Sequence, residues 1–389
     1  MPSVTPFPLI LAIWGAGLGA AGQYAKVSVT FDRFAALYPD AGVAAGFIVS
    51  LVGFVGIVFG VVAGLVVARI RYRRALLWAL WAGAGLSALQ ALLPPLPVML
   101  ALRGLEGVSH LAIVVAAPTL IAQLSAPQHR GLTLTLWSTF FGVTFTLLVI
   151  FGLPLVEARG LPALLIAHGI WMALFALILG AMLPRIEAEV PPLHLSNILR
   201  DHGAIYRSPR MAAPALGWLF YTFCFLAILT VLPPYIAADM RAWVIGAMPL
   251  TSIAVSMSLG VLALRVVTPV SLVQIGFGGS IASLLWLLAA PGLPAACLAL
   301  AAALGLIQGA SFAAVPDLNT APADQAKANG AIAQMGNLGN TLGTPALLMV
   351  LGVAGYAGLI WTSIAVFACG IAVHGALSLR RLQERSRAA

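Results

Sequence analysis

The chain has 389 residues, of which 61% are hydrophobic and only 8% are charged, and its mean hydropathy is +1.04. A soluble protein carries roughly 25% charged residues, so this composition excludes a soluble fold and indicates an integral membrane protein. The net charge of +9 lies in short clusters between apolar stretches, a pattern typical of topology-setting loops and not of a nucleic-acid-binding face.

Apolar stretches of membrane-spanning length follow one another along the chain. A transmembrane helix needs about 20 apolar residues, which predicts an all-α integral membrane protein with twelve transmembrane helices. We expect these helices at residues 8–27, 43–68, 75–93, 98–124, 132–155, 161–183, 211–236, 243–264, 269–290, 294–315, 328–351 and 356–379.

One long polar segment separates the predicted spans into two sets of six. We expect residues 1–184 to form an N-terminal six-helix bundle and residues 185–210 a cytoplasmic linker. Residues 211–389 are expected to form a C-terminal six-helix bundle with a short basic tail. A weak internal repeat supports two related halves, because segment 102–109 aligns without gaps on segment 304–311.

Lys and Arg residues gather in the loops on one side of the predicted spans. The clusters within residues 69–74 and 380–387, and the basic residues of the predicted linker, all fall on that side. By the positive-inside rule this side is cytoplasmic. The chain is therefore predicted to be a multi-pass protein of the inner (cytoplasmic) membrane, with both termini in the cytoplasm.

The loop between the second and third spans has a distinctive pattern. It reads GLVVARIRYRR over residues 64–74, which resembles the signature loop of the major facilitator superfamily. That loop has a glycine, three residues, Asp-Arg, one residue, a glycine, one residue and two cations. Ala68 replaces the aspartate and Arg71 replaces the second glycine. The positions that match are Gly64, Arg69, Arg73 and Arg74.

The resemblance implies a fold of two six-helix bundles and a gating role for this cytoplasmic loop. In the family the loop helps to hold the two halves together on the cytoplasmic side in the outward-open state. Losing the aspartate implies a weaker or differently built contact. A plain topology-setting cluster of cations is the alternative interpretation.

The fourth predicted span carries ionisable residues deep in an apolar segment. Arg103, Glu106 and His110 have the spacing i, i+3, i+7 and share one helix face. The segment is similar to the family's Arg-x-x-Gln-Gly element, with Glu106 where Gln is common. Charges at this depth are costly unless paired or hydrated, and so indicate a functional site. We predict proton coupling or substrate binding by these residues; the alternative is a structural Arg103–Glu106 pair.

The fifth predicted span departs from one branch of the family. Drug–proton antiporters of the superfamily carry a Gly-Pro-rich element here, whereas this chain has Gly142-Val-Thr-Phe-Thr146, and Pro154 lies only near the outer end. This difference weakens, without excluding, the interpretation as a drug exporter.

Other polar residues at membrane depth are candidates for lining a central cavity. Their alternative role is hydrogen bonding between helices. Lys26 has a further alternative, in which its ammonium extends to the outer membrane interface. His168 and His374 have no charged neighbour on their helices and are expected to be structural. The candidates are Gln23, Tyr24, Lys26, Trp137, Ser138, Tyr221, Gln308, Ser311, Gln334, Asn337 and Asn340.

These features predict a secondary active transporter that works by alternating access. No nucleotide-binding motif occurs in the sequence, so coupling to protons is favoured over ATP hydrolysis. The expected substrate is a small polar or anionic organic solute, and a proton-coupled exporter of hydrophobic or drug-like compounds is the alternative. The direction of transport is left open.

An enzyme in the membrane is a remote alternative, because no reactive constellation or metal-ligand spacing is present. We expect no cofactor, no metal and no nucleic-acid partner. The expected partners are the transported small molecule, protons and membrane lipid, and the chain is expected to act as a monomer.

Overall fold

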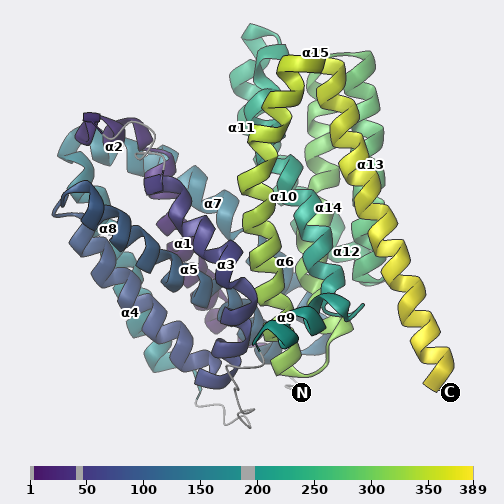
Figure 1. Cartoon of the computed structure of the whole chain (residues 1–389), viewed down its shortest axis with the longest axis horizontal. Coiled ribbons are helices and arrows are strands. Elements are labelled where there is room, and N and C mark those ends of the chain that lie inside the picture. Colours follow the sequence, from purple (N-terminus) through teal and green to yellow (C-terminus); the bar gives the residue numbers. More distant parts are fainter. Residues whose placement is uncertain (1–3, 41–46, 185–197, 389) are drawn as a thin grey trace. The chain divides into compact units, whose positions relative to one another are not determined.

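A computed structural model gives the fold of residues 4–40, 47–184 and 198–388 (Figure 1). The secondary structure of these described residues is helical, without β-strands. The chain divides into two compact units. Unit 1 comprises Met1–Thr133 and Thr139–Ile198, and unit 2 comprises Leu134–Ser138 and Leu199–Ala389.

Unit 1 is built around one central helix. Helix α5 begins at Leu96 after its N-cap Pro95, and Pro97 in its first turn has no amide hydrogen that would need a partner there. It packs against α1, α3 and α4, and α8 covers α1 and α4. The helices of this unit are α1 (Phe7–Ser28), α2 (Phe31–Leu37), α3 (Phe47–Ile70), α4 (Tyr72–Gln90), α5 (Leu96–Leu124), the start of α6 (Arg130–Ser138), α7 (Phe140–Leu147) and α8 (Leu153–Met182).

Unit 2 has a comparable central helix, α14, which packs against α10, α11 and α13. Helix α15 covers α10 and α13, and Figure 1 shows it folding back on itself as two arms. The helices of this unit are α9 (Ile198–Arg207), α10 (Ala212–Val231), α11 (Ala238–Val255), α12 (Val261–Ala263), α13 (Pro269–Ala289), α14 (Pro294–Leu318) and α15 (Pro322–Ala388).

Eight helical segments of the described residues are long and apolar enough to cross a membrane. Two of them, Pro127–Met182 and Pro322–Glu384, have 56 and 63 residues, which is enough for two crossings each. Gly160 in the first has φ 80° and Gly355 in the second has φ 64°. Glycine tolerates this conformation without a Cβ clash, so each long segment can reverse direction there.

Helices α5 and α14 carry the two aligned repeats and are the most enclosed of these segments. In each of the two helices, 78% of the most apolar 18-residue stretch is buried, the largest share among the eight segments. An apolar helix enclosed on most sides belongs in a bundle centre. Polar groups placed on these two helices are therefore kept away from lipid.

Two short helices were not expected from the sequence. Helix α2 follows the first predicted span, and α9 lies inside the predicted linker. Residues 185–197 of that linker lie outside the described residues. The division into bundles at 1–184 and 211–389 with a linker between them therefore stays a prediction.

Candidate functional site

The predicted ionisable residues of the fourth span lie on the enclosed face of α5. Arg103 and Glu106 have no exposed side-chain surface, and His110 is 5% exposed. Their spacing turns them toward α1 and α4 instead of lipid. Burial of this kind demands hydrogen-bond partners for every charged group.

The Glu106 carboxylate has three donors from three helices. Lys26 of α1 donates its Nζ to Oε1 at 2.6 Å, and Gln90 of α4 donates Nε2 to Oε2 at 2.7 Å. Arg103 donates Nη1 to Oε2 from one helical turn away. One buried carboxylate is thus held between two cations.

Lys26 uses all three of its ammonium hydrogens. Besides Glu106, its Nζ donates to Ser87 Oγ at 2.8 Å and lies 3.3 Å from His168 Nδ1. An ammonium has three donors and no acceptor, so these contacts complete its coordination. The sequence had suggested that Lys26 lines a central cavity or extends to the outer membrane interface. In the structure its side chain is instead fully buried between helices.

His168 is oriented by its second ring nitrogen. Nε2 lies 2.9 Å from the carbonyl of Gly19, and a carbonyl only accepts, so Nε2 carries a proton. Neutral His168 then offers Nδ1 as an acceptor to Lys26. Ser87 meanwhile donates its hydroxyl to the Leu165 carbonyl at 2.9 Å. His168 therefore belongs to the charged network, although its lack of a charged neighbour on α8 favoured a purely structural role.

Arg103 is anchored by backbone carbonyls. Nε donates to Ile48 O at 2.6 Å, and Nη1 donates to Gln23 O at 2.8 Å. Three buried polar atoms of the network have no hydrogen-bond partner among the described residues: Arg103 Nη2, Gln23 Oε1 and Gln90 Oε1. The network thus has one donor group and two acceptors left for a polar ligand or water.

His110 is held apart from this network. Its Nδ1 bonds to the carbonyl of Ala20 at 2.8 Å, which fixes the proton on that nitrogen. No bond joins it to Arg103 or Glu106 in the described part of the chain. Of the three residues predicted on this face, the structure brings Arg103 and Glu106 together and directs His110 to α1.

The ionised network carries one net positive charge, because Lys26 and Arg103 face a single carboxylate. Removing one partner of a buried ion pair is costly, so the three charges depend on one another. Protonating Glu106 would leave two adjacent cations without a counter-ion. The arrangement can therefore couple a proton on Glu106 to a negative charge supplied by a ligand.

The remaining candidates in unit 1 surround this network in part. Gln23 donates Nε2 to Ser109 Oγ at 2.8 Å and lies beside Arg103. Tyr24 is half-buried, and its ring centroid is 6.0 Å from that of Phe141. These two extend the polar region along α1.

Among the described residues, the candidates in unit 2 do not form a comparable charged cluster. Gln308 donates to the carbonyl of Ser138 at 2.5 Å, and Gln334 accepts from Tyr206 at 2.6 Å. Ser311 and Asn337 bond to carbonyls of their own helices. Of the other candidates, Trp137 and Tyr221 are buried and Asn340 is half-buried.

Comparison with known proteins identifies the scaffold on which this network is built. The family model of the Major Facilitator Superfamily matches residues 27–344. The chain belongs to the major facilitator superfamily. A sequence comparison with curated proteins gave no match.

Solved structures of the superfamily share the fold at low sequence identity. The human organic anion transporter MFSD10 (TETRAN) is 15% identical, with a TM-score of 0.76 over 96% of this chain and 100% of that one. The E. coli fucose:proton symporter FucP is 17% identical, with a TM-score of 0.72 over 97% and 98%. The proton:xylose symporter XylE is 15% identical, with a TM-score of 0.73 over 96% and 95%. The chain is accordingly a transporter and not an enzyme.

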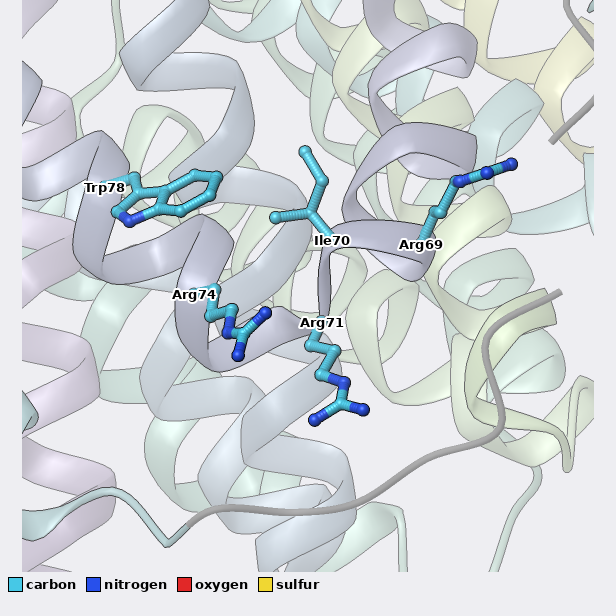
Figure 2. Close-up of a pocket in the computed structure, with 5 residues that line it drawn as sticks. All are labelled: Arg69, Ile70, Arg71, Arg74 and Trp78. Carbon is cyan, nitrogen blue, oxygen red and sulfur yellow. The ribbon is translucent and has the colours of Figure 1, made fainter. Parts of the chain in front are cut away.

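The superfamily's signature loop is the turn between α3 and α4. Arg73 donates Nε to Leu183 O at 3.0 Å and Nη2 to Gly180 O at 2.7 Å, so it caps the carboxyl end of α8. Gly64 is buried within α3. Arg69 and Arg74 instead line a pocket at the turn (Figure 2). The matching residues of the loop therefore divide into a helix cap and a pocket lining.

Sequence reasoning missed Ser87, Gln90 and His168 as members of the charged network. Ser87 and Gln90 are three residues apart and share a face of α4. Two polar residues at this spacing near the end of an apolar span were the available signal. Nothing in the sequence indicated that His168 on α8 would meet them.

Proposed function

We propose that the chain is a proton-coupled secondary transporter of a small organic anion, spanning the inner membrane twelve times with both termini in the cytoplasm. Eight described segments are long and apolar enough to cross a membrane. Counting Pro127–Met182 and Pro322–Glu384 as two crossings each gives ten spans, and α1 and α4 bring the number to twelve. The proposed mechanism is alternating access by two six-helix bundles. The proposed domain boundaries are those expected from the sequence.

The observation that carries the proposal is the buried network of Lys26, Glu106 and Arg103. It holds one carboxylate that can take up a proton and two cations that can bind an anion. Protonation of Glu106 removes the counter-charge of both cations and so favours anion binding. By linkage, a bound anion favours protonation of Glu106 to the same extent. Proton and anion would then cross together.

The functions for which similar solved proteins are named support this proposal in kind. One is named an organic anion transporter, and two are named proton symporters of sugars. A neutral sugar would need hydroxyl-directed hydrogen bonds and no net charge in the site. The positive charge of this network therefore favours an anionic solute over a sugar.

A thermal-shift screen tests the proposal on the purified, full-length protein in detergent. The probes are benzoate, lactate, fucose, xylose and tetraphenylphosphonium, each at one acidic and one mildly alkaline pH. A ligand that binds the folded state raises the melting temperature. We expect a small anion to stabilise the protein more at the acidic pH. Stabilisation by neither anion, or equal stabilisation at both pH values, would count against the proposal.

A second candidate function rests on an aromatic group in α10 and α14. The Tyr221 ring stacks between Trp218 and Phe225, with centroid distances of 4.6 and 5.1 Å. Phe312 meets Trp218 edge-on at 5.1 Å. Such a group suits a hydrophobic or drug-like cation. A shift with tetraphenylphosphonium alone, lost in Trp218→Ala, would favour this function over anion transport.

A further inference from the structure

The turn between α3 and α4 forms a pocket of about 410 Å³. Its lining consists of Arg69, Ile70, Arg71, Arg74 and Trp78. Figure 2 shows the guanidinium groups of Arg71 and Arg74 on the same side of the turn, while Arg69 points away from them. Three cationic and two apolar residues thus line one hollow, and the charged groups of two of the cations lie on the same side of it.

The positive charges of Arg71 and Arg74 have no acidic partner within the described ranges. The first turn of α4 contains no acidic residue. Neither Arg71 nor Arg74 forms an ion pair with any residue of the described ranges. Both lie at the amino end of α4, where the helix dipole already disfavours cations and attracts anions. An anion in the pocket would neutralise the two guanidinium groups and would interact favourably with the dipole of α4.

Arg71 adopts a backbone conformation that a side chain disfavours. Its φ is 76° and its ψ is 128°, and the superfamily's loop has glycine at this position. An L-residue with a Cβ at such a φ is strained, and strain of this kind persists at functional sites. Arginine in place of glycine thus adds a cation at a cost in conformational energy.

Trp78 gives the pocket an apolar wall that is open to its surroundings. It lies four residues after Arg74, so the two share one face of α4, and it is 62% exposed. Tryptophan is enriched at the level of lipid headgroups. The positive-inside rule assigns this turn to the cytoplasmic face, where anionic lipids attract clustered cations.

We propose that this pocket binds a phosphate group through Arg71 and Arg74, with Trp78 beside the apolar part of the same molecule. Arginine binds phosphate with paired N–H donors. The phosphate can belong to the headgroup of an anionic phospholipid or to a soluble phosphate ester. The exposed Trp78 favours the lipid. This site is separate from the buried network and does not depend on the proposed transport cycle.

The test uses the full-length protein in neutral detergent with added phosphatidylglycerol or phosphatidylcholine of the same acyl chains. The readouts are the melting temperature and the number of lipids retained in native mass spectrometry. The variants are Arg71→Gly, Arg74→Gln and the double variant. Arg265→Gln, at an exposed arginine of unit 2, controls for the loss of one positive charge.

We expect phosphatidylglycerol to raise the melting temperature of the natural protein more than phosphatidylcholine does. The double variant should lose most of this difference and retain at most half as much phosphatidylglycerol, whereas Arg265→Gln should keep both. Arg71→Gly should also be more stable than the natural protein in phosphatidylcholine, because glycine relieves the strain. A gain in stability together with lost lipid binding excludes misfolding as the cause.

Inorganic phosphate and glycerol 3-phosphate, added without lipid, distinguish the source of the phosphate. If inorganic phosphate or glycerol 3-phosphate raises the melting temperature of the natural protein but not that of the double variant, the pocket binds a soluble phosphate. A shift confined to phosphatidylglycerol assigns it to a lipid headgroup. The proposal is overturned if the double variant keeps the full response to phosphatidylglycerol, or if no phosphate-bearing probe stabilises the protein more than phosphatidylcholine does.

Discussion

The Lys26 ammonium lies 2.6 Å from Glu106 Oε1, and both side chains are fully buried. The two residues are 80 positions apart in the chain, so only the packing of α1 against α5 brings them together. The same carboxylate also accepts from Arg103 and Gln90. In the proposed cycle this ion pair opens when a proton replaces Lys26 and Arg103 as the partner of Glu106.

Glu106→Gln should destabilise the protein by about 3 to 5 kcal/mol, because it leaves two buried cations without a counter-ion. Lys26→Met should cost less, since Arg103 and Glu106 remain a balanced pair. The double variant has the same net charge as the natural network. We therefore expect it to be more stable than Glu106→Gln by at least about 1 kcal/mol.

A double-mutant cycle of thermal or denaturant unfolding in detergent measures this coupling. The control pair is Glu384 and Arg210, an exposed ion pair, for which we expect a coupling of about 0 to 1 kcal/mol. Additive losses at Lys26 and Glu106 would mean that the two residues do not act as a pair.

Ser87→Ala should destabilise the protein by about 1 to 3 kcal/mol, because Lys26 loses an acceptor and the Leu165 carbonyl loses a donor. Ser311→Ala is the matched control. Ser311 is also buried, but within the described part of the chain its hydroxyl bonds only to the Ile307 carbonyl of its own helix, so its loss should cost no more than about 1 kcal/mol. Melting temperatures in one detergent compare the two, and equal losses would place Ser87 outside the network.

Arg73→Ala should lower stability by about 1 to 2 kcal/mol, because two carbonyls at the end of α8 lose a charged donor. Arg74→Ala should change stability little in neutral detergent, since Arg74 forms no ion pair and no side-chain hydrogen bond within the described ranges. The melting temperatures of the two variants check this difference. A larger loss for Arg74→Ala would mean that the cap of α8 is wrongly assigned.

The partly buried hydroxyl of Tyr206 on α9 predicts that the stability of the folded protein depends on pH in the alkaline range. Burial raises the pKa of its hydroxyl well above the usual value of about 10. The folded state therefore holds this proton more tightly than the unfolded state does. The resulting stabilisation is complete below about pH 10 and declines as the pH rises further.

Tyr206→Phe should lose this decline together with the bond to Gln334, at a cost of about 1 kcal/mol below pH 10. The measurement is the melting temperature of both proteins from neutral to alkaline pH. The difference between them should narrow above about pH 10. A constant difference at every pH would show that the hydroxyl titrates normally.

Composition and apolar length predicted the helical membrane fold correctly, because both follow from the lipid environment alone. The resemblance carried by residues 64–74 and 103–107 also identified the superfamily, which the family model confirms. The short helices α2 and α9 were missed. They lie in polar segments outside the spans, where neither hydropathy nor length distinguishes a helix from a loop.

For the candidate site, helix spacing predicted the neighbouring pair Arg103 and Glu106, because residues at i and i+3 on a helix always share a face. Spacing says nothing about which helices pack together. The contacts of Lys26 with Ser87, His168 and Glu106 join four helices, and that arrangement was not visible in the sequence. The same limit applies to Arg73, whose partners on α8 are 107 and 110 residues away.

The most direct test of the proposed coupling is solute accumulation in proteoliposomes under an imposed pH gradient, using benzoate or lactate, whichever gives the larger thermal shift. The natural protein should accumulate the solute with the gradient and also exchange it without one. The Lys26→Met, Glu106→Gln double variant, with the same net charge, should still exchange the solute but no longer accumulate it. Accumulation by the double variant equal to that of the natural protein would contradict the assignment of proton coupling to Glu106.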